Sequence, residues 1–184
     1  MVDLSLCKDY VHHIYSKDDV DGCGIFVNKY FITAGHIGKD DFWVLHGGMK
    51  ISFCREDCTF IACNPKNADD YEIAIFPSKG IVSPLKLGNK INFGDELDCY
   101  SIKHVGGKDE RYIPILCKGR VSEVKGNFFL CSMSEILTEG SSGSPIFNGD
   151  ELVGILVGCP GAVKKNILFN SISSILPIIN HTFD

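Results

Sequence analysis

The sequence predicts an all-β protein made of two halves that are joined near the middle of the chain. Short runs of strand-forming residues, each about 4–8 residues long, alternate with Gly, Asn, Asp and Pro along most of the 184 residues. No apolar pattern with the repeat of a helix persists through this region. Residues 76–84 contain two Pro, one Gly and two Ser, which is typical of a linker. We therefore expect an N-terminal half over residues 1–78, a linker over 79–90 and a C-terminal half over 91–184.

The predicted strands are short apolar or alternating runs with turn residues on both sides. Asn28-Lys29 and Asn148-Gly149 each separate two such runs, and Asn-Gly is a strong signal for a tight β-hairpin turn. We expect hairpins at both places. The runs lie at residues 24–27, 30–34, 42–45, 60–63 and 73–76 in the first half, and at 97–102, 113–117, 128–131, 144–147 and 152–158 in the second.

The end of the chain has a different pattern. Residues 171–179 carry apolar side chains at helix-compatible spacing, with serines that can cap a helix. Pro177 must then lie in the first turn or end the helix, because proline donates no backbone hydrogen bond. We expect a short C-terminal helix.

The composition excludes several classes of protein. Apolar residues make up 45% of the chain and charged residues 22%, as in ordinary globular proteins. The net charge of −5 argues against a protein that coats nucleic acid. There is no run of about 20 apolar residues, so we expect no membrane span. The first residues include Asp3 and Lys8 and lack the apolar core of a secretory signal.

The nine cysteines are an odd and high number. A secreted disulfide framework favours an even number and a signal sequence. We therefore expect most of the cysteines to be reduced and buried as small apolar residues, in a protein of the cytoplasm.

The clearest signal for chemistry is a turn of small residues around Ser142. Residues 140–145 read Gly-Ser-Ser-Gly-Ser-Pro, and the glycines let the backbone direct N–H groups inward, as an acyl-transfer oxyanion requires. The alternative is a flexible loop without a role. An α/β-hydrolase is disfavoured, because its Gly-x-Ser-x-Gly elbow precedes a helix, whereas here the second Gly comes one position early and a strand-like run follows.

A serine nucleophile needs a base and a group that orients it. His36 directly follows the small residues Ala34 and Gly35, and imidazole suits proton transfer near neutral pH. Asp70 and Glu72 lie just before the apolar run 73–76, where a carboxylate can orient the imidazole. Taken alone, the histidine is equally an ordinary surface or core residue, and the acids a solvated turn.

Together, these three stretches resemble the chymotrypsin-like serine proteases. The order histidine, acid, serine and the rough spacing match that family over about residues 22–160. The matching motifs are Cys-Gly-Ile-Phe-Val at 23–27 with Thr-Ala-Gly-His at 33–36, an acid before Ile-Ala-Ile at 73–75, and the 140–145 turn with Gly-Ile-Leu-Val-Gly at 154–158.

The resemblance implies two antiparallel six-stranded β-barrels with the active site between them. It implies that Ser142 is the nucleophile and His36 the general base, with Glu72 as the third member of the triad and Asp70 as the alternative acid. The backbone N–H groups of Gly140 and Ser142 would form the oxyanion hole.

The same resemblance places the substrate. Residues 136–141 and 154–160 would wall the pocket for the residue before the cut, with Thr138 as a pocket hydroxyl. A polypeptide would bind as an extended strand along Ile155, Leu156, Val157 and Gly158.

Four features depart from patterns within the family, three of them from its secreted members. Glu72 replaces their aspartate, Ser141 replaces the aspartate that pairs with a newly cut N-terminus, and Ile37 replaces a disulfide cysteine. The Gly-x-His with which many viral members read Gln or Glu is absent, because Ile155 and Leu156 follow Gly154. With these departures and its small size, the chain resembles the viral polyprotein-processing proteases that use serine, such as those of toroviruses and arteriviruses.

We therefore expect a serine endopeptidase that processes a viral polyprotein in the host cytoplasm and needs no cofactor. The alternatives are a bacterial or phage protease of the same fold, and an inactive barrel pair that serves as a binding module. A zinc site at Cys54, Cys58 and Cys63 with His46 has poor spacing. A mild basic cluster at Lys103, Lys108, Arg111, Lys118 and Arg120 allows weak RNA binding at most, because the net charge opposes strong binding; a solvated face is the favoured interpretation.

Overall fold

The strands of the first half form two antiparallel sheets. The structure is a computed structural model that describes residues 2–17, 22–88, 90–105, 111–137, 140–161 and 165–181. Within these residues, a five-stranded sheet has the order β1-β2-β3-β7-β6, and β4 pairs with β5. A bridge between Tyr15 and Trp43 joins the two sheets. The strands are β1 (Val11–Ile14), β2 (Gly22–Val27), β3 (Tyr30–Thr33), β4 (Phe42–His46), β5 (Met49–Phe53), β6 (Phe60–Ala62) and β7 (Ile73–Pro77).

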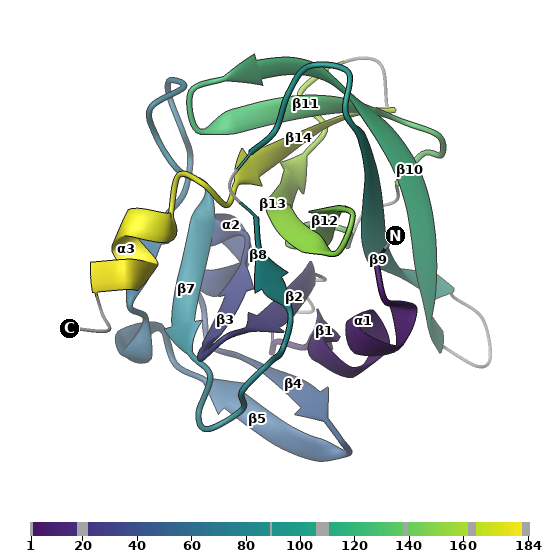
Figure 1. Ribbon diagram of the computed structural model, residues 1–184. Coiled ribbons are helices and arrows are strands. Elements are labelled where there is room, and N and C mark those ends of the chain that lie inside the picture. The colour runs from purple at the N-terminus through teal and green to yellow at the C-terminus, as the bar shows by residue number, and fades with distance from the viewer. Residues whose placement is uncertain are drawn as a thin grey trace.

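The strands of the second half close into a barrel (Figure 1). Six of them follow one another in the order β12-β9-β10-β11-β14-β13, and pairing between β12 and β13 completes the ring. The short β8 lies parallel to β13 at its edge. The strands are β8 (Lys86–Leu87), β9 (Glu96–Val105), β10 (Arg111–Lys125), β11 (Phe128–Met133), β12 (Pro145–Asn148), β13 (Glu151–Gly158) and β14 (Asn166–Ser171). The predicted all-β fold is confirmed, with this half as the closed six-stranded barrel.

Both predicted hairpin turns are present. Asn28 joins β2 to β3 with a φ of 50°, and Gly149 joins β12 to β13 with a φ of 62°. Asparagine and glycine adopt this left-handed conformation more easily than other residues, which explains why they occupy these turns.

The predicted C-terminal helix is confirmed as α3 (Leu176–His181), which begins later than expected. Pro177 lies in its first turn, where a missing N–H costs no helical hydrogen bond. Three short helical segments were not predicted: α1 (Leu4–Tyr10), α2 (Gly35–Gly38) and the 3₁₀ turn η1 (Arg55–Asp57). The signal for α1 is Asp3, whose side chain accepts a hydrogen bond from the Ser5 N–H as an N-cap does.

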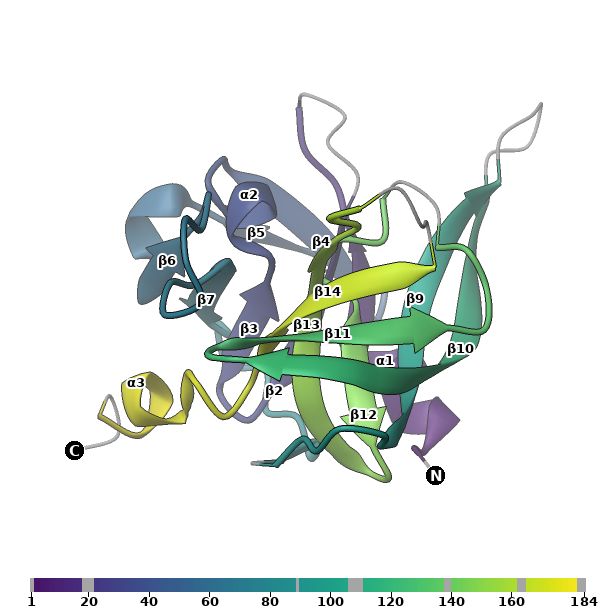
Figure 2. The same cartoon turned by 90° about the horizontal axis from the view of Figure 1, so that it is seen from above.

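One hydrophobic core cluster joins the two halves. Ile25 and Ile75 of the first half pack in it with Phe147 and Ile155 of the second. The ends of the chain contribute as well, because α1 and α3 both supply buried residues, and α3 lies beside β7 of the first half (Figures 1 and 2). The contact between the halves therefore includes packing from both ends of the chain. The division into separate units at residues 79–90 stays a prediction.

Five of the nine cysteines are buried, among them Cys7, Cys117 and Cys131. Burial raises the pKa of the Cys7 and Cys131 thiols to about 12 and helps to raise that of Cys117 to about 11. These side chains act as small apolar residues of the core, because a thiol with so high a pKa is a poor nucleophile. Among the described residues, no helix is both long enough and apolar enough to cross a membrane.

Candidate active site

His36 lies in the single turn of α2, directly after β3. This turn packs closely on its neighbours, because a Cβ at Gly35 would lie 1.9 Å from the Ala62 carbonyl oxygen of β6. A Cβ at Gly38 would likewise lie 2.4 Å from the side chain of Ala74 in β7. The small residues around His36 therefore let α2 sit against the sheet, while the imidazole remains 37% exposed.

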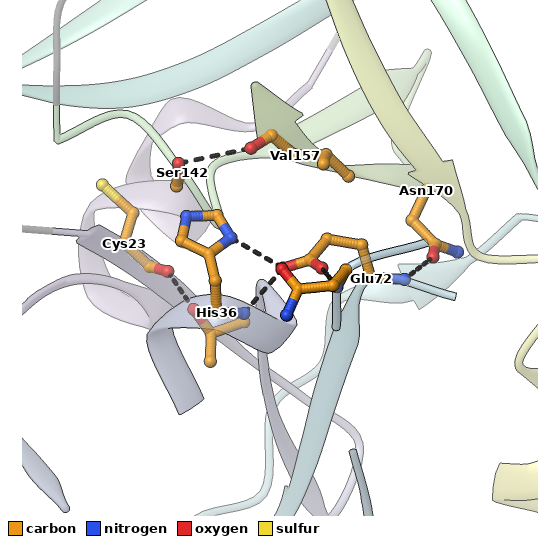
Figure 3. A network of polar contacts seen from close by, with 8 residues as sticks. Cys23, His36, Glu72, Ser142, Val157 and Asn170 are labelled. Atoms are coloured by element: carbon orange, nitrogen blue, oxygen red, sulfur yellow. Dashed lines mark hydrogen bonds and ion pairs between the residues drawn. The ribbon is translucent and has the colours of Figure 1, made fainter. Parts of the chain in front are cut away.

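The carboxylate of Glu72 is buried under α2 and contacts His36 twice (Figure 3). Its Oε1 atom accepts hydrogen bonds from His36 Nδ1 and from the His36 backbone N–H, each at 2.6 Å. Its Oε2 atom accepts one from the Asn64 backbone N–H at 2.9 Å. Because the carboxylate accepts at Nδ1, the proton of a neutral imidazole lies there and the lone pair lies at Nε2.

The charge state of Glu72 follows from the same contacts. Burial by itself raises the pKa of this carboxyl, but the hydrogen bonds and the charge of His36, together with the Asn64 N–H, outweigh burial and hold the pKa below its ordinary value. Glu72 is thus an ionised group with 3% exposure that can stabilise a positive imidazolium.

Asp70, the alternative acid, has a different position. Its Oδ2 atom accepts hydrogen bonds from the backbone N–H groups of Lys66 at 2.7 Å and Asn67 at 3.1 Å. This carboxylate caps its own loop, as aspartate commonly does. In the structure Glu72, and not Asp70, contacts the imidazole.

Two asparagines that the sequence analysis missed hold Glu72 in place. Asn64 has a φ of 59°, a left-handed conformation that asparagine tolerates, and this directs its N–H to the carboxylate. Asn170 of β14 is fully buried, and its Oδ1 atom accepts the Glu72 backbone N–H at 2.8 Å. The sequence signal for Asn64 is its place before Pro65; Asn170, in a strand of the other half, has no local signal.

Ser142 faces the His36 ring from the loop before β12 (Figure 3). Its backbone carbonyl accepts the Cys23 N–H of β2 at 2.7 Å, so the first half holds this loop of the second half. Its Oγ atom donates to the Val157 carbonyl at 3.4 Å. Figure 3 shows the second ring nitrogen of His36 on the side that faces Ser142. No hydrogen bond joins the two side chains among the described residues; such bonds are often long before substrate binds.

The loop around Ser142 is held by glycines and by Ser144. A Cβ at Gly143, whose φ is 88°, would lie 1.9 Å from the Cys23 carbonyl oxygen. The Ser144 hydroxyl is 2.5 Å from the Ser141 carbonyl oxygen and 2.7 Å from the Ser101 hydroxyl. Within the described part of the chain, the N–H groups of Gly140 and Ser142 have no protein acceptor. Two amides without a described acceptor, on the turn that carries the serine, can donate hydrogen bonds to a negative oxygen.

The residues expected to bind substrate separate into four groups. Leu156 and Gly158 line a pocket of about 210 Å³ beside Ser142. Val157 lies at an irregularity in the pairing of β13 with β14, and its carbonyl faces Ser142. Ile155 is fully buried in the core cluster that joins the halves, and therefore lies away from the pocket, because neighbouring side chains of a strand point to opposite faces. Thr138 lies outside the described residues.

The other candidate sites have simpler roles in the structure. The Cys58 thiol lies 3.0 Å from the Phe60 carbonyl oxygen, and His46 Nδ1 lies 3.0 Å from His12 Nε2. Within the described ranges, no three potential ligands gather at one point, so nothing supports the zinc alternative. Of the basic cluster, Arg120 pairs with Glu96, Lys118 is exposed, and Lys108 lies outside the described residues. RNA binding stays a prediction.

Comparisons with known proteins show the fold. No protein-family model matches the sequence, and no curated protein matches it. Among solved structures, kallikrein-related peptidase 10 in complex with Zn²⁺ superposes with a TM-score of 0.71 at 16% identity, over 97% of each chain. Neuropsin, a serine protease of mouse brain, gives 0.73 at 16% identity, over 97% of this chain and 96% of its own. The scabies mite inactivated protease paralogue S-D1 gives 0.74 at 11% identity, over 96% and 92%.

The chain has the fold of the chymotrypsin-like serine proteases. The predicted resemblance is confirmed at this level. One of the three neighbours is named as inactivated, so the fold by itself does not show activity. The case for an activity rests on the geometry of His36, Glu72 and Ser142.

Replacing Asn170 with alanine is expected to lower the free energy of unfolding by about 1–3 kcal/mol, because it leaves the buried Glu72 N–H without an acceptor. It also removes the bond from Asn170 Nδ2 to Ser174 Oγ. Urea unfolding measures the change. Asn166→Ala, at the other end of β14, is the matched control; equal losses in the two variants would show that the Glu72 contact contributes nothing.

Stability is expected to fall when the protein is acidified, in part through Glu72. The folded-state pKa of this group is below its ordinary value of 4.5. Its contribution is therefore complete above about pH 4.5 and is lost as the pH falls through the folded-state pKa. Urea unfolding measured over this range should give a smaller loss for Glu72→Gln than for the wild type. Parallel curves for the two proteins would contradict the assignment.

Proposed function

We propose that the protein is a serine endopeptidase that cleaves polypeptides through an acyl-enzyme on Ser142. The observation that carries the proposal is the ionised, buried Glu72 that fixes the tautomer of an imidazole facing a serine on a glycine-rich turn. A base oriented by a third group, beside a nucleophile and free amides, is the arrangement that acyl transfer requires.

The chemistry follows from these positions. Ser142 Oγ attacks the carbonyl carbon of the peptide bond while its proton passes to His36 Nε2, and Glu72 stabilises the imidazolium that forms. The negative oxygen of the tetrahedral intermediate binds the N–H groups of Gly140 and Ser142. His36 then gives its proton to the leaving amine, and water hydrolyses the ester by the same steps.

The substrate is an extended polypeptide that adds to the edge of β13. The side of this strand that faces Ser142 is paired as far as Leu156, which exchanges hydrogen bonds with Gly143 and Ser144. Beyond Leu156, the described residues provide no strand on that side, so the main chain of residues 157–158 is available to a substrate strand.

The biological part of the proposal is the processing of a viral polyprotein in the host cytoplasm. It rests on the resemblance to viral enzymes of the glutamate at the triad position and the isoleucine at 37. If the chain is part of a polyprotein, the protein should cleave peptides that span its junctions with the flanking sequences. A gene that encodes the chain alone in a bacterial or phage genome would contradict this part of the proposal.

Labelling with a fluorophosphonate probe tests the activity itself. The folded protein should react with one equivalent of probe, and the label should be found on Ser142 by peptide mass spectrometry. The rival function is an inactive binding module. The observation that favours it is that Ser142 Oγ donates to the Val157 carbonyl and not to His36. A folded protein that stays unlabelled would support the rival.

A further inference from the structure

The pocket beside Ser142 is lined by three large apolar side chains and by the small residues of the serine turn and the end of β13. It has a volume of about 210 Å³, and its lining comes from segments far apart in the sequence. Leu156 of β13 and Ile167 of β14, with exposures of 3% and 2%, line it together with Leu137. The remaining described lining residues are Gly140, Ser141, Ser142, Gly158 and Cys159.

The pocket adjoins the reacting atoms and opens beside the substrate edge. Gly140 and Ser142, whose backbone N–H groups are the proposed oxyanion donors, are part of its wall. Gly158, at the end of β13, is part of its wall too, and a Cβ built there would meet no atom within 4 Å. A peptide bound along β13, with its carbonyl at Ser142, can therefore place one side chain in this space.

The lining decides which side chain is accepted. The side chains of Leu137, Leu156 and Ile167 carry no polar atom, so a Lys, Glu or Gln side chain packed against them would lose water without gaining a partner from them. An apolar side chain gains free energy when it leaves water. A cavity of about 150 Å³ lined by apolar residues can hold benzene, so this pocket has room for a leucine or phenyl group.

We infer that the protein cleaves after apolar residues of about the size of leucine or phenylalanine, with Leu137, Leu156, Ile167 and the open position at Gly158 determining this preference. The inference rests on the proposed function. It names a substrate class that neither the fold nor the order of the triad residues specifies.

The test uses diphenyl phosphonate esters of N-acylated aminoalkyl groups that copy the side chains of Leu, Phe, Ala, Lys, Glu and Gln. In each reaction Ser142 Oγ forms a bond to phosphorus, phenoxide leaves, and the hydroxyl proton passes through His36 to the phenoxide. We expect the Leu and Phe reagents to label Ser142 at least about 10-fold faster than the Lys, Glu and Gln reagents.

A substitution at the open position makes the test specific to the pocket. Gly158→Val adds a side chain without a clash, and it should slow labelling by the Leu and Phe reagents at least about 10-fold more than labelling by the smaller Ala reagent. Gly161→Val is the matched control, since a Cβ at Gly161 also meets no atom within 4 Å, but Gly161 does not line the pocket. Its rates should stay within about twofold of the wild type.

The outcomes separate this inference from the proposed function. If the fluorophosphonate probe labels Ser142 but the Lys, Glu or Gln reagents react fastest, the inference is wrong and the endopeptidase proposal stands. Equal effects of Gly158→Val and Gly161→Val would also overturn the inference. If neither the fluorophosphonate nor any phosphonate labels the folded protein, the endopeptidase proposal itself fails, and the inference fails with it.

Discussion

Replacing Ser142 with alanine is expected to lower kcat for peptide cleavage by about 10⁶-fold, to the level that binding and the oxyanion amides alone support. The substitution removes only Oγ, whose described bond is the long one to Val157. The backbone bond from Cys23 to the carbonyl of residue 142 remains, so the loop should keep its place. The loss would therefore report the missing nucleophile and not a misfolded site.

The measurement is cleavage of a peptide library by purified protein, with circular dichroism to show that each variant is folded. Ser122→Ala is the matched control, because Ser122 is an exposed serine of β10 whose hydroxyl bonds to the Leu130 carbonyl. It should retain wild-type kcat. Cleavage by Ser142→Ala at the wild-type rate would end the endopeptidase proposal.

Replacing Glu72 with glutamine is expected to lower kcat by about 10⁴-fold, with little change in KM. Glutamine has nearly the same shape but no charge, so it cannot stabilise the imidazolium. Its amide group can also donate to Nδ1, which favours the tautomer whose proton is on Nε2, and that nitrogen is then unable to accept the proton of Ser142.

Asp70→Asn is the natural comparison, because Asp70 lies two residues earlier in the same acidic turn. Its Oδ2 accepts only backbone N–H groups of its own loop, at Lys66 and Asn67. This variant should lose much less activity than Glu72→Gln. A profile of kcat against pH for both variants checks the assignment, and the opposite order of losses would mean that the acid is Asp70.

Local patterns were sufficient to predict much of the architecture. Strand-forming runs between Gly, Asn and Pro indicate β2, β3, β7 and β13, because these preferences act between neighbours in the chain. The hairpin turns at Asn28 and Gly149 follow for the same reason, since each needs a positive φ. In contrast, α2 is a single turn held by contacts of Gly35 and Gly38 with β6 and β7, so no periodic pattern marks it.

The sequence by itself determined the chemical groups of the candidate site, since a serine on a glycine turn, a histidine after small residues and a pair of acids are visible in the residues alone. Only the tertiary structure shows that Glu72, and not Asp70, contacts His36, because the N–H groups that surround Glu72 come from Asn64 and from α2. It likewise decided the character of the pocket, whose walls come from Leu137, β13 and β14. Contacts between distant segments depend on how the two halves pack, and the pattern of neighbouring residues does not specify that packing.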